Sequence, residues 1–321
     1  MRKLKEELEN QGYTGDTLKD AMRFILSNKD FSEFFTYNRN IKPEDYDELN
    51  TMMFGKYNDY LKLEDCNLTE VPEWVGKLGK LEVLSLSENN LTSLPDSIGN
   101  LVKLTNLDLD VNNLTSLPEW IGKLGKLEVL SLSQNNLTEI PDSIDNLTNL
   151  RRLSLHHNNL TQLPESISKL VKLTSLNLSG NNFTDFPESI GNLVNLEVLG
   201  LGNSNLTDFP ESIGNLVKLK YLYLAGSNLT ELPESIGNLV NLTTLNLSRN
   251  NLTSLPEWIG NLTNLKELIL WYNNLTSLPD SIGNLTNLKE LDLKINKFTP
   301  EYKTSLKAHL AEKLPNCNVQ I

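Results

Sequence analysis

Two adjacent histidines, His156 and His157, are the residues of this chain whose type and spacing best suit a metal ion. A metal site would need further ligands, and no carboxylate recurs at a ligand spacing in the same stretch of sequence. The chain has three histidines in all and contains no glycine-rich phosphate loop, Ser/His/Asp set or Cys-x-x-Cys cluster. We therefore expect no catalytic residue, no metal and no cofactor, and a protein that is not an enzyme.

Recognition of another protein is the chemistry that a second set of residues favours. Tyr, Trp and Arg dominate the energetics of protein interfaces, and here they gather where equivalent positions elsewhere carry small residues such as Ser131, Asn177 and Gly200. The predicted contact residues are Tyr221, Tyr223, Arg249, Ile269, Trp271 and Tyr272. The alternative is that these are ordinary surface aromatics, because scattered exposed apolar residues need no functional explanation.

A charged set forms a secondary candidate for partner binding. Its basic members are Arg151, Arg152, His156 and His157, and its acidic members, Asp108 and Asp110, come earlier in the chain. Acidic residues near the start of the concave face and basic residues near its middle would orient a charged partner. Exposed charges contribute little individually, so we rank this set below the aromatic one.

A unit of 23 residues positions all of these side chains. Its template is LxxLxLxxNxLTxLPxxIGxLxx, and ten full copies run from residue 58, with a partial eleventh from residue 288. Alternation of leucine with other residues predicts a short strand, with Leu84 and Leu86 pointing inward and Val83 and Ser85 outward. Stacked units then form one parallel sheet.

This stacking predicts which recognition residues are neighbours. One strand per unit puts Tyr223, Asn246 and Ile269 in a row across the sheet, with Arg249 beside Tyr272.

The ninth position of the unit is asparagine in most copies, where the chain turns sharply inside the coil. A buried side-chain amide there can pair with backbone groups that the turn leaves without partners. Cys66, Ser204 and Ser227 replace it in three units.

The return limb of the unit resembles a short helical turn. Pro95 is expected at the first helical position, Asp96 in the first turn and Gly99 as the stop. An acidic residue follows the proline in every full unit. We attribute these carboxylates to separate favourable contacts with the helix dipole rather than to a cation-binding stripe.

These markers together resemble the leucine-rich repeat family, in the 23-residue class of bacterial, spirochaete-type proteins and of intracellular Ras-pathway and scribble-like scaffolds. The resemblance implies an α/β fold, a curved right-handed solenoid with a parallel sheet on the concave face and short helical turns on the convex face.

Three regions are expected. Residues 1–57 lack the period and form a helical N-terminal cap, residues 58–296 are the repeat array, and residues 297–321 form a helix-and-strand C-terminal cap. Whether the N-terminal helices also bind a partner stays open.

The net charge of −12 opposes binding to nucleic acid. No signal peptide or apolar run long enough to span a membrane is visible, so we expect a soluble, cytoplasmic protein, with secretion or surface exposure by another route as the alternative. Cys66 and Cys317 lie about ten units apart and are expected to be reduced. A monomer is favoured.

The predicted function is a scaffold that binds a protein or peptide on the concave face. The alternatives are a bacterial surface or effector protein that engages host molecules, a regulator in a small-GTPase pathway, and a consensus-like or engineered array with no selected ligand.

Overall fold

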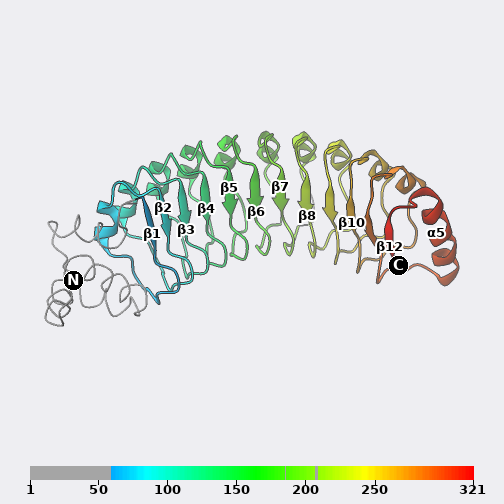
Figure 1. Ribbon diagram of the computed structural model, residues 1–321, viewed down its shortest axis with the longest axis horizontal. Helices are drawn as coiled ribbons and strands as arrows, with labels where there is room; N and C mark the ends of the chain where they lie inside the picture. Colours follow the sequence, from blue (N-terminus) through cyan, green and yellow to red (C-terminus); the bar gives the residue numbers. More distant parts are fainter. Residues whose placement is uncertain (1–58, 185, 207–208) are drawn as a thin grey trace, which may run out of the picture.

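A computed structural model of the chain describes residues 59–184, 186–206 and 209–321. Over these residues the chain is an open, curved solenoid, an arch whose short helical turns lie along the outer rim (Figure 1). This is the architecture that the repeat predicted. The expected helical cap at residues 1–57 lies outside the described part.

The twelve described strands form one parallel sheet in chain order. From β1 to β11, each strand residue pairs with its equivalent one unit away, so Tyr223, Asn246 and Ile269 lie in a row, as predicted. The strands are β1 (Tyr60–Lys62), β2 (Val83–Ser85), β3 (Asn106–Asp108), β4 (Val129–Ser131), β5 (Arg152–Ser154), β6 (Ser175–Asn177), β7 (Val198–Gly200), β8 (Tyr221–Tyr223), β9 (Thr244–Asn246), β10 (Glu267–Ile269), β11 (Glu290–Asp292) and β12 (Asn318–Gln320).

Alternate strand residues point into the core, as the leucine pattern predicted. Leu84 and Leu86 are fully buried and Val83 is partly exposed. Ser85, expected to be exposed, is only 5% exposed, because its hydroxyl bonds to Glu64 and Asp108 and those longer side chains cover it.

The helical turns of the return limb are 3-10 helices of five residues. Their bounds are η2 (Glu73–Lys77), η3 (Asp96–Asn100), η4 (Glu119–Lys123), η5 (Asp142–Asn146), η6 (Glu165–Lys169), η7 (Glu188–Asn192), η8 (Glu211–Asn215), η9 (Glu234–Asn238), η10 (Glu257–Asn261) and η11 (Asp280–Asn284). Pro95 is the N-cap of its turn, one position earlier than predicted, and Asp96 is the first helical residue.

Where a turn contains glycine, that glycine does not end the helix, which is where the prediction was wrong; η5 and η6 carry Asp145 and Ser168 at the same position. Gly191 lies inside η7, whose C-cap is Leu193 with φ −79°. A Cβ at Gly191 would lie 2.6 Å from the backbone oxygen of Ser212 in the next turn. Close packing between successive turns therefore requires glycine there, whereas positive φ does not.

Asparagine side chains tie successive units together inside the coil, as predicted. Asn135 accepts a hydrogen bond from the backbone N–H of Leu114 (3.0 Å) and donates to the carbonyl oxygens of Leu109 (2.9 Å) and Leu132 (3.2 Å). The same pattern of bonds recurs at Asn89, Asn112, Asn158, Asn181, Asn250, Asn273 and Asn296.

The C-terminal end follows the prediction. Helix α5 (Pro300–Lys313) is capped by the Thr299 hydroxyl and buries Leu306 and Leu310 over the last units, and β12 extends the sheet beyond β11. Cys66 is buried and Cys317 partly buried, and both are thiols. Among the described residues, no helix is both long and apolar enough to cross a membrane.

Candidate binding surface

The predicted contact residues lie on the solvent-facing side of the sheet, which we call the sheet face, and in the loops that follow the strands, except for Arg151, which precedes β5. The aromatic group, defined as Tyr221, Tyr223, Arg249, Ile269, Trp271 and Tyr272, spans strands β8–β10 and the loops that follow β9 and β10. Tyr221, Tyr223 and Tyr272 are 39%, 37% and 57% exposed. The structure therefore brings the aromatic group together on one accessible surface.

Arg249 and Trp271 contact each other through both side chain and backbone. The guanidinium of Arg249 lies over the Trp271 ring, 4.7 Å from the ring centre, and the Arg249 N–H donates to the Trp271 carbonyl (2.9 Å). Trp271 and Tyr272 meet edge to face with their centres 6.1 Å apart. Arg249 makes no ion pair within the described chain, so its guanidinium is oriented and still available to a carboxylate.

Ile295 extends this surface and was missed by the sequence analysis. It occupies the loop position of Arg249 and Tyr272 one unit further on, and it is 64% exposed. Its φ of 54° is sterically unfavourable for a β-branched residue. The 23-residue period alone would have placed it beside Tyr272.

The charged set separates into three arrangements. Arg151 pairs with Glu128 (3.6 Å), whereas Arg152 has no ion pair among the described residues. Asp110 and His156 are joined through two serines: Asp110 accepts from the Ser133 N–H (2.6 Å), Ser133 and Ser154 share a hydroxyl hydrogen bond (2.8 Å), and Ser154 bonds to His156 Nδ1 (3.1 Å).

Burial shifts the titration of both ends of this network. It raises the pKa of the Asp110 carboxyl and lowers the pKa of His156. His157 packs over Gly180, where a Cβ would lie 2.6 Å from its Nδ1. In the part of the chain that the structure describes, no three histidine, cysteine or acidic residues are grouped as metal ligands would be.

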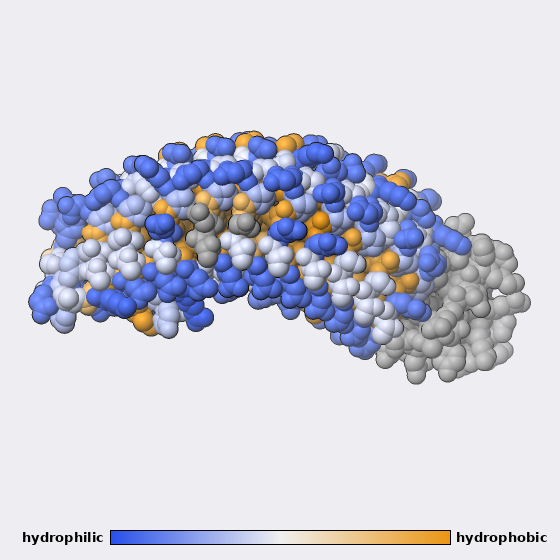
Figure 2. All heavy atoms as spheres, turned by 180° about the vertical axis from the view of Figure 1, so that it is seen from behind, coloured by the Kyte–Doolittle hydropathy of each residue, from blue (hydrophilic) through white to orange (hydrophobic). Residues whose placement is uncertain are grey.

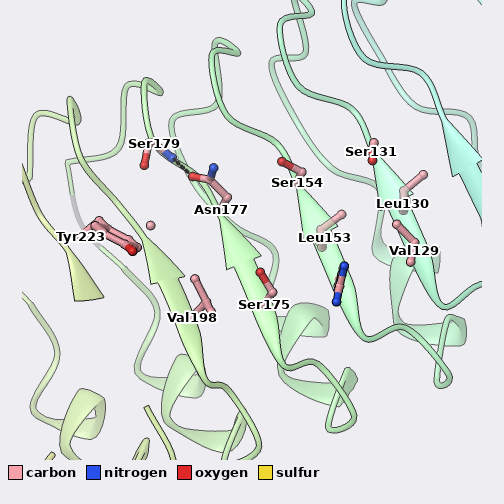
Figure 3. Close-up of a pocket in the computed structure, with 12 residues that line it drawn as sticks. Val129, Leu130, Ser131, Leu153, Ser154, Ser175, Asn177, Ser179, Val198 and Tyr223 are labelled. Carbon is pink, nitrogen blue, oxygen red and sulfur yellow. Dashed lines mark hydrogen bonds between the residues drawn. The ribbon is translucent and has the colours of Figure 1, made fainter. Parts of the chain in front are cut away.

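A hollow of about 450 Å³ lies on the sheet face between the charged set and the aromatic group (Figure 3). It extends over strands β4–β8, with Arg152 lining it on β5 and Tyr223 bordering it on β8. Its lining is otherwise small: Val129, Leu130, Ser131, Leu153, Ser154, Ser175, Asn177, Ser179, Val198 and Gly200. Ser131, Asn177 and Gly200, expected from the sequence to be a background of small residues, are thus part of the lining of this hollow.

Tryptophans on the return limb serve packing. Trp120 is 6% exposed and its Cβ lies against Gly99 of the preceding turn, while Trp258 packs partly buried on the core.

Over the face of the arch in Figure 2, hydrophilic residues predominate and hydrophobic ones form an interrupted band along the array.

Comparison with known proteins gives consistent results. A profile described as a leucine-rich repeat region matches residues 56–135, 129–210 and 203–314. A leucine-rich repeat protein of Leptospira interrogans has a similar structure, with 31% identity, a TM-score of 0.51, and coverage of 85% of this chain and 86% of its own. A search of curated proteins finds no match.

Other solved structures share the fold. The plant peptide hormone receptor RGFR1, solved in complex with RGF2, is 34% identical with a TM-score of 0.69, over 81% of this chain and 43% of the receptor. An internalin of Listeria monocytogenes, 24% identical with a TM-score of 0.63 over 81% of this chain and 79% of its own, shows a likeness of fold alone.

Proposed function

We propose that this chain, which belongs to the leucine-rich repeat family, is a non-enzymatic scaffold that binds a protein or peptide on its sheet face. The aromatic group is its main contact. The observation that carries the proposal is the guanidinium of Arg249 held 4.7 Å over Trp271, next to a tyrosine that is 57% exposed.

Binding orders the side chains at the interface, and this ordering costs free energy. Aromatic side chains offer large contact areas with few rotatable bonds, and an arginine already stacked on a ring loses less freedom when a carboxylate arrives. Residues of these types in three consecutive units concentrate binding energy in a small area.

The solved relatives lend support by analogy. RGFR1 was solved in complex with RGF2, and the Arabidopsis receptor kinase HAESA in complex with the peptide hormone IDA. Peptide binding by leucine-rich repeat proteins that resemble this chain makes a peptide the first ligand to test.

The test uses a ligand selected from a displayed library of random twelve-residue peptides. Substituting Trp271→Ala or Tyr223→Ala should each weaken binding of the selected peptide about 30-fold, as expected for a buried interface anchor. Isothermal titration calorimetry measures the change in Kd.

Tyr60→Ala is the matched control, because Tyr60 is a 45% exposed tyrosine on the same face at the distant strand β1. It should leave the affinity unchanged. Wild-type affinity in both the Trp271 and the Tyr223 variants would refute the site.

A further inference from the structure

The hollow lined by Arg152 and Tyr223 is not required by the packing of the repeat units, and it lies beside the aromatic group. We propose that it receives an extended peptide segment, whose acidic side chain pairs with Arg152 and whose apolar side chain, about four residues away, contacts Tyr223. This inference rests on the proposed function and names the class of ligand that the same surface takes.

The spacing follows from the sheet. Arg152 begins β5 and Tyr223 ends β8, so three strand spacings separate their columns. At ~4.8 Å per spacing this is ~14 Å, which an extended peptide covers in about four residues at ~3.3 Å each. The ligand therefore crosses the strands.

Arg152 supplies the site for the acidic group. It is exposed and faces the hollow, and no carboxylate of the described chain forms an ion pair with it. Its neighbour Arg151 differs, because Glu128 lies 3.6 Å from it. An unpaired guanidinium offers a planar pair of donors that matches a carboxylate.

The acidic residues beyond the hollow set the direction of the ligand. Asp108 ends β3, and Asp110 follows it, two strands from β5 on the side away from Tyr223. A peptide carboxylate is repelled by these two groups and attracted by Arg152. The remainder of the peptide is therefore expected to run from β5 toward β8 and the aromatic group.

The lining between the two ends suits a peptide backbone. Asn177 Oδ1 accepts from the Ser179 N–H (3.2 Å), and its Nδ2 makes no hydrogen bond within the described chain, so it can donate to a peptide carbonyl (Figure 3). Gly200 keeps the floor open, because a Cβ there would lie 2.6 Å from Asn177 Oδ1. Val198 on β7 adds apolar surface between the two ends.

The experiment uses synthetic peptides of eight residues, acetylated and amidated so that one glutamate carries the only charge. Each has one Glu and one Phe in a Ser/Gly background, separated by one to six positions. Wild-type protein should bind the four-position separation most tightly, and replacing the peptide's Glu by Gln should weaken binding about tenfold.

Substitutions in the protein locate the contacts. Arg152→Ala should abolish the preference for Glu over Gln, whereas the control Lys220→Ala, at an exposed cation paired with Glu197, should retain it. Tyr223→Ala should abolish the preference for Phe over Ala. Circular dichroism checks that each variant is folded.

Three results would overturn the inference. They are equal affinity of the wild-type protein for the Glu and Gln peptides, a preference for Glu that survives in the Arg152→Ala variant, and a preference for Glu of the same size at every Glu–Phe separation. If peptides from the displayed library still bind and still require Trp271, the proposed function stands and only the inference fails. If no peptide binds and folded proteins alone do, the peptide ligand is refuted.

Discussion

Two neighbouring stretches of the array differ in how their units are joined inside the coil. From Asn89 to Asn181, every unit places a side-chain amide between itself and the preceding unit. The next two units carry Ser204 and Ser227 instead. The Ser227 hydroxyl donates to the Leu201 oxygen (3.1 Å), but the buried Ser204 hydroxyl has no hydrogen-bond partner in the described chain.

The units that carry serine instead of the inner asparagine also differ from the 23-residue template on their exposed surface. The unit of Ser204 also carries Gly200, which keeps the hollow open, and it precedes the tyrosines of β8. Because a repeat array is held by contacts between neighbours, we expect the coupling between units to be weakest there.

The largest expected effect comes from breaking the regular stretch. Asn135→Ala would remove the side-chain partner of one buried N–H and of three carbonyl oxygens, and should lower the free energy of unfolding by about 3 kcal/mol. Urea denaturation followed by circular dichroism measures it. Ser204→Ala is the control and should cost less than about 1 kcal/mol, since no hydrogen bond is lost. Equal losses would contradict the comparison.

Repairing the interrupted stretch should have a smaller effect of opposite sign. In the unit before, the Leu160 N–H donates to Asn181 Oδ1 (3.0 Å), and Phe183 occupies the position of Leu160 opposite Ser204. Ser204→Asn should therefore stabilise the fold by about 1 kcal/mol and slow hydrogen exchange at the Phe183 amide. Unchanged exchange there would show that the serine unit is not the weak joint.

The smallest effect is a pH dependence within the regular stretch. Burial lowers the folded-state pKa of His156 below its ordinary value of 6.5, so the unfolded chain takes up the proton first as pH falls. The free energy of unfolding should drop by about a few tenths of a kcal/mol between pH 7 and 5, since the side chain is partly solvated. His156→Gln should lack this component, and identical pH profiles would refute it.

Asp110 contributes in the opposite sense. Its raised pKa means that the folded chain binds the proton more readily as pH approaches its ordinary value of 3.8. As pH falls, Asp110 therefore adds to the free energy of unfolding while His156 subtracts from it, and comparing wild type with His156→Gln isolates the His156 contribution.

Much of the fold could be predicted from the sequence because the same pattern of buried leucines and inner asparagines recurs in almost every 23-residue unit. The leucines fixed the buried face of each strand, and Asn135 and its equivalents marked the inner turn. The turn glycines were misread, since their role is set by the distance to the next unit, as at Gly191 and Ser212. Local sequence holds no measure of that distance.

The candidate site was predictable in part. The period placed Tyr223 beside Asn246 and Ile269, and it would also have placed Ile295 beside Tyr272. The stacking of Arg249 on Trp271 was not predictable, because it depends on side-chain torsions and on the twist between neighbouring units. Whether the aromatic group binds a ligand stays a prediction.

By itself, the sequence determined the repeat, the parallel sheet, the inner asparagines and the end cap, because periodic burial of leucine admits one way of stacking the units. Tertiary structure alone decided that Arg151 is paired while Arg152 has no ion pair among the described residues, that Ser85 is covered, and that the short side chains on strands β4–β7 leave a hollow. The reason is physical: burial follows from local pattern, whereas charge pairing and surface shape depend on distances between units that are far apart in the chain.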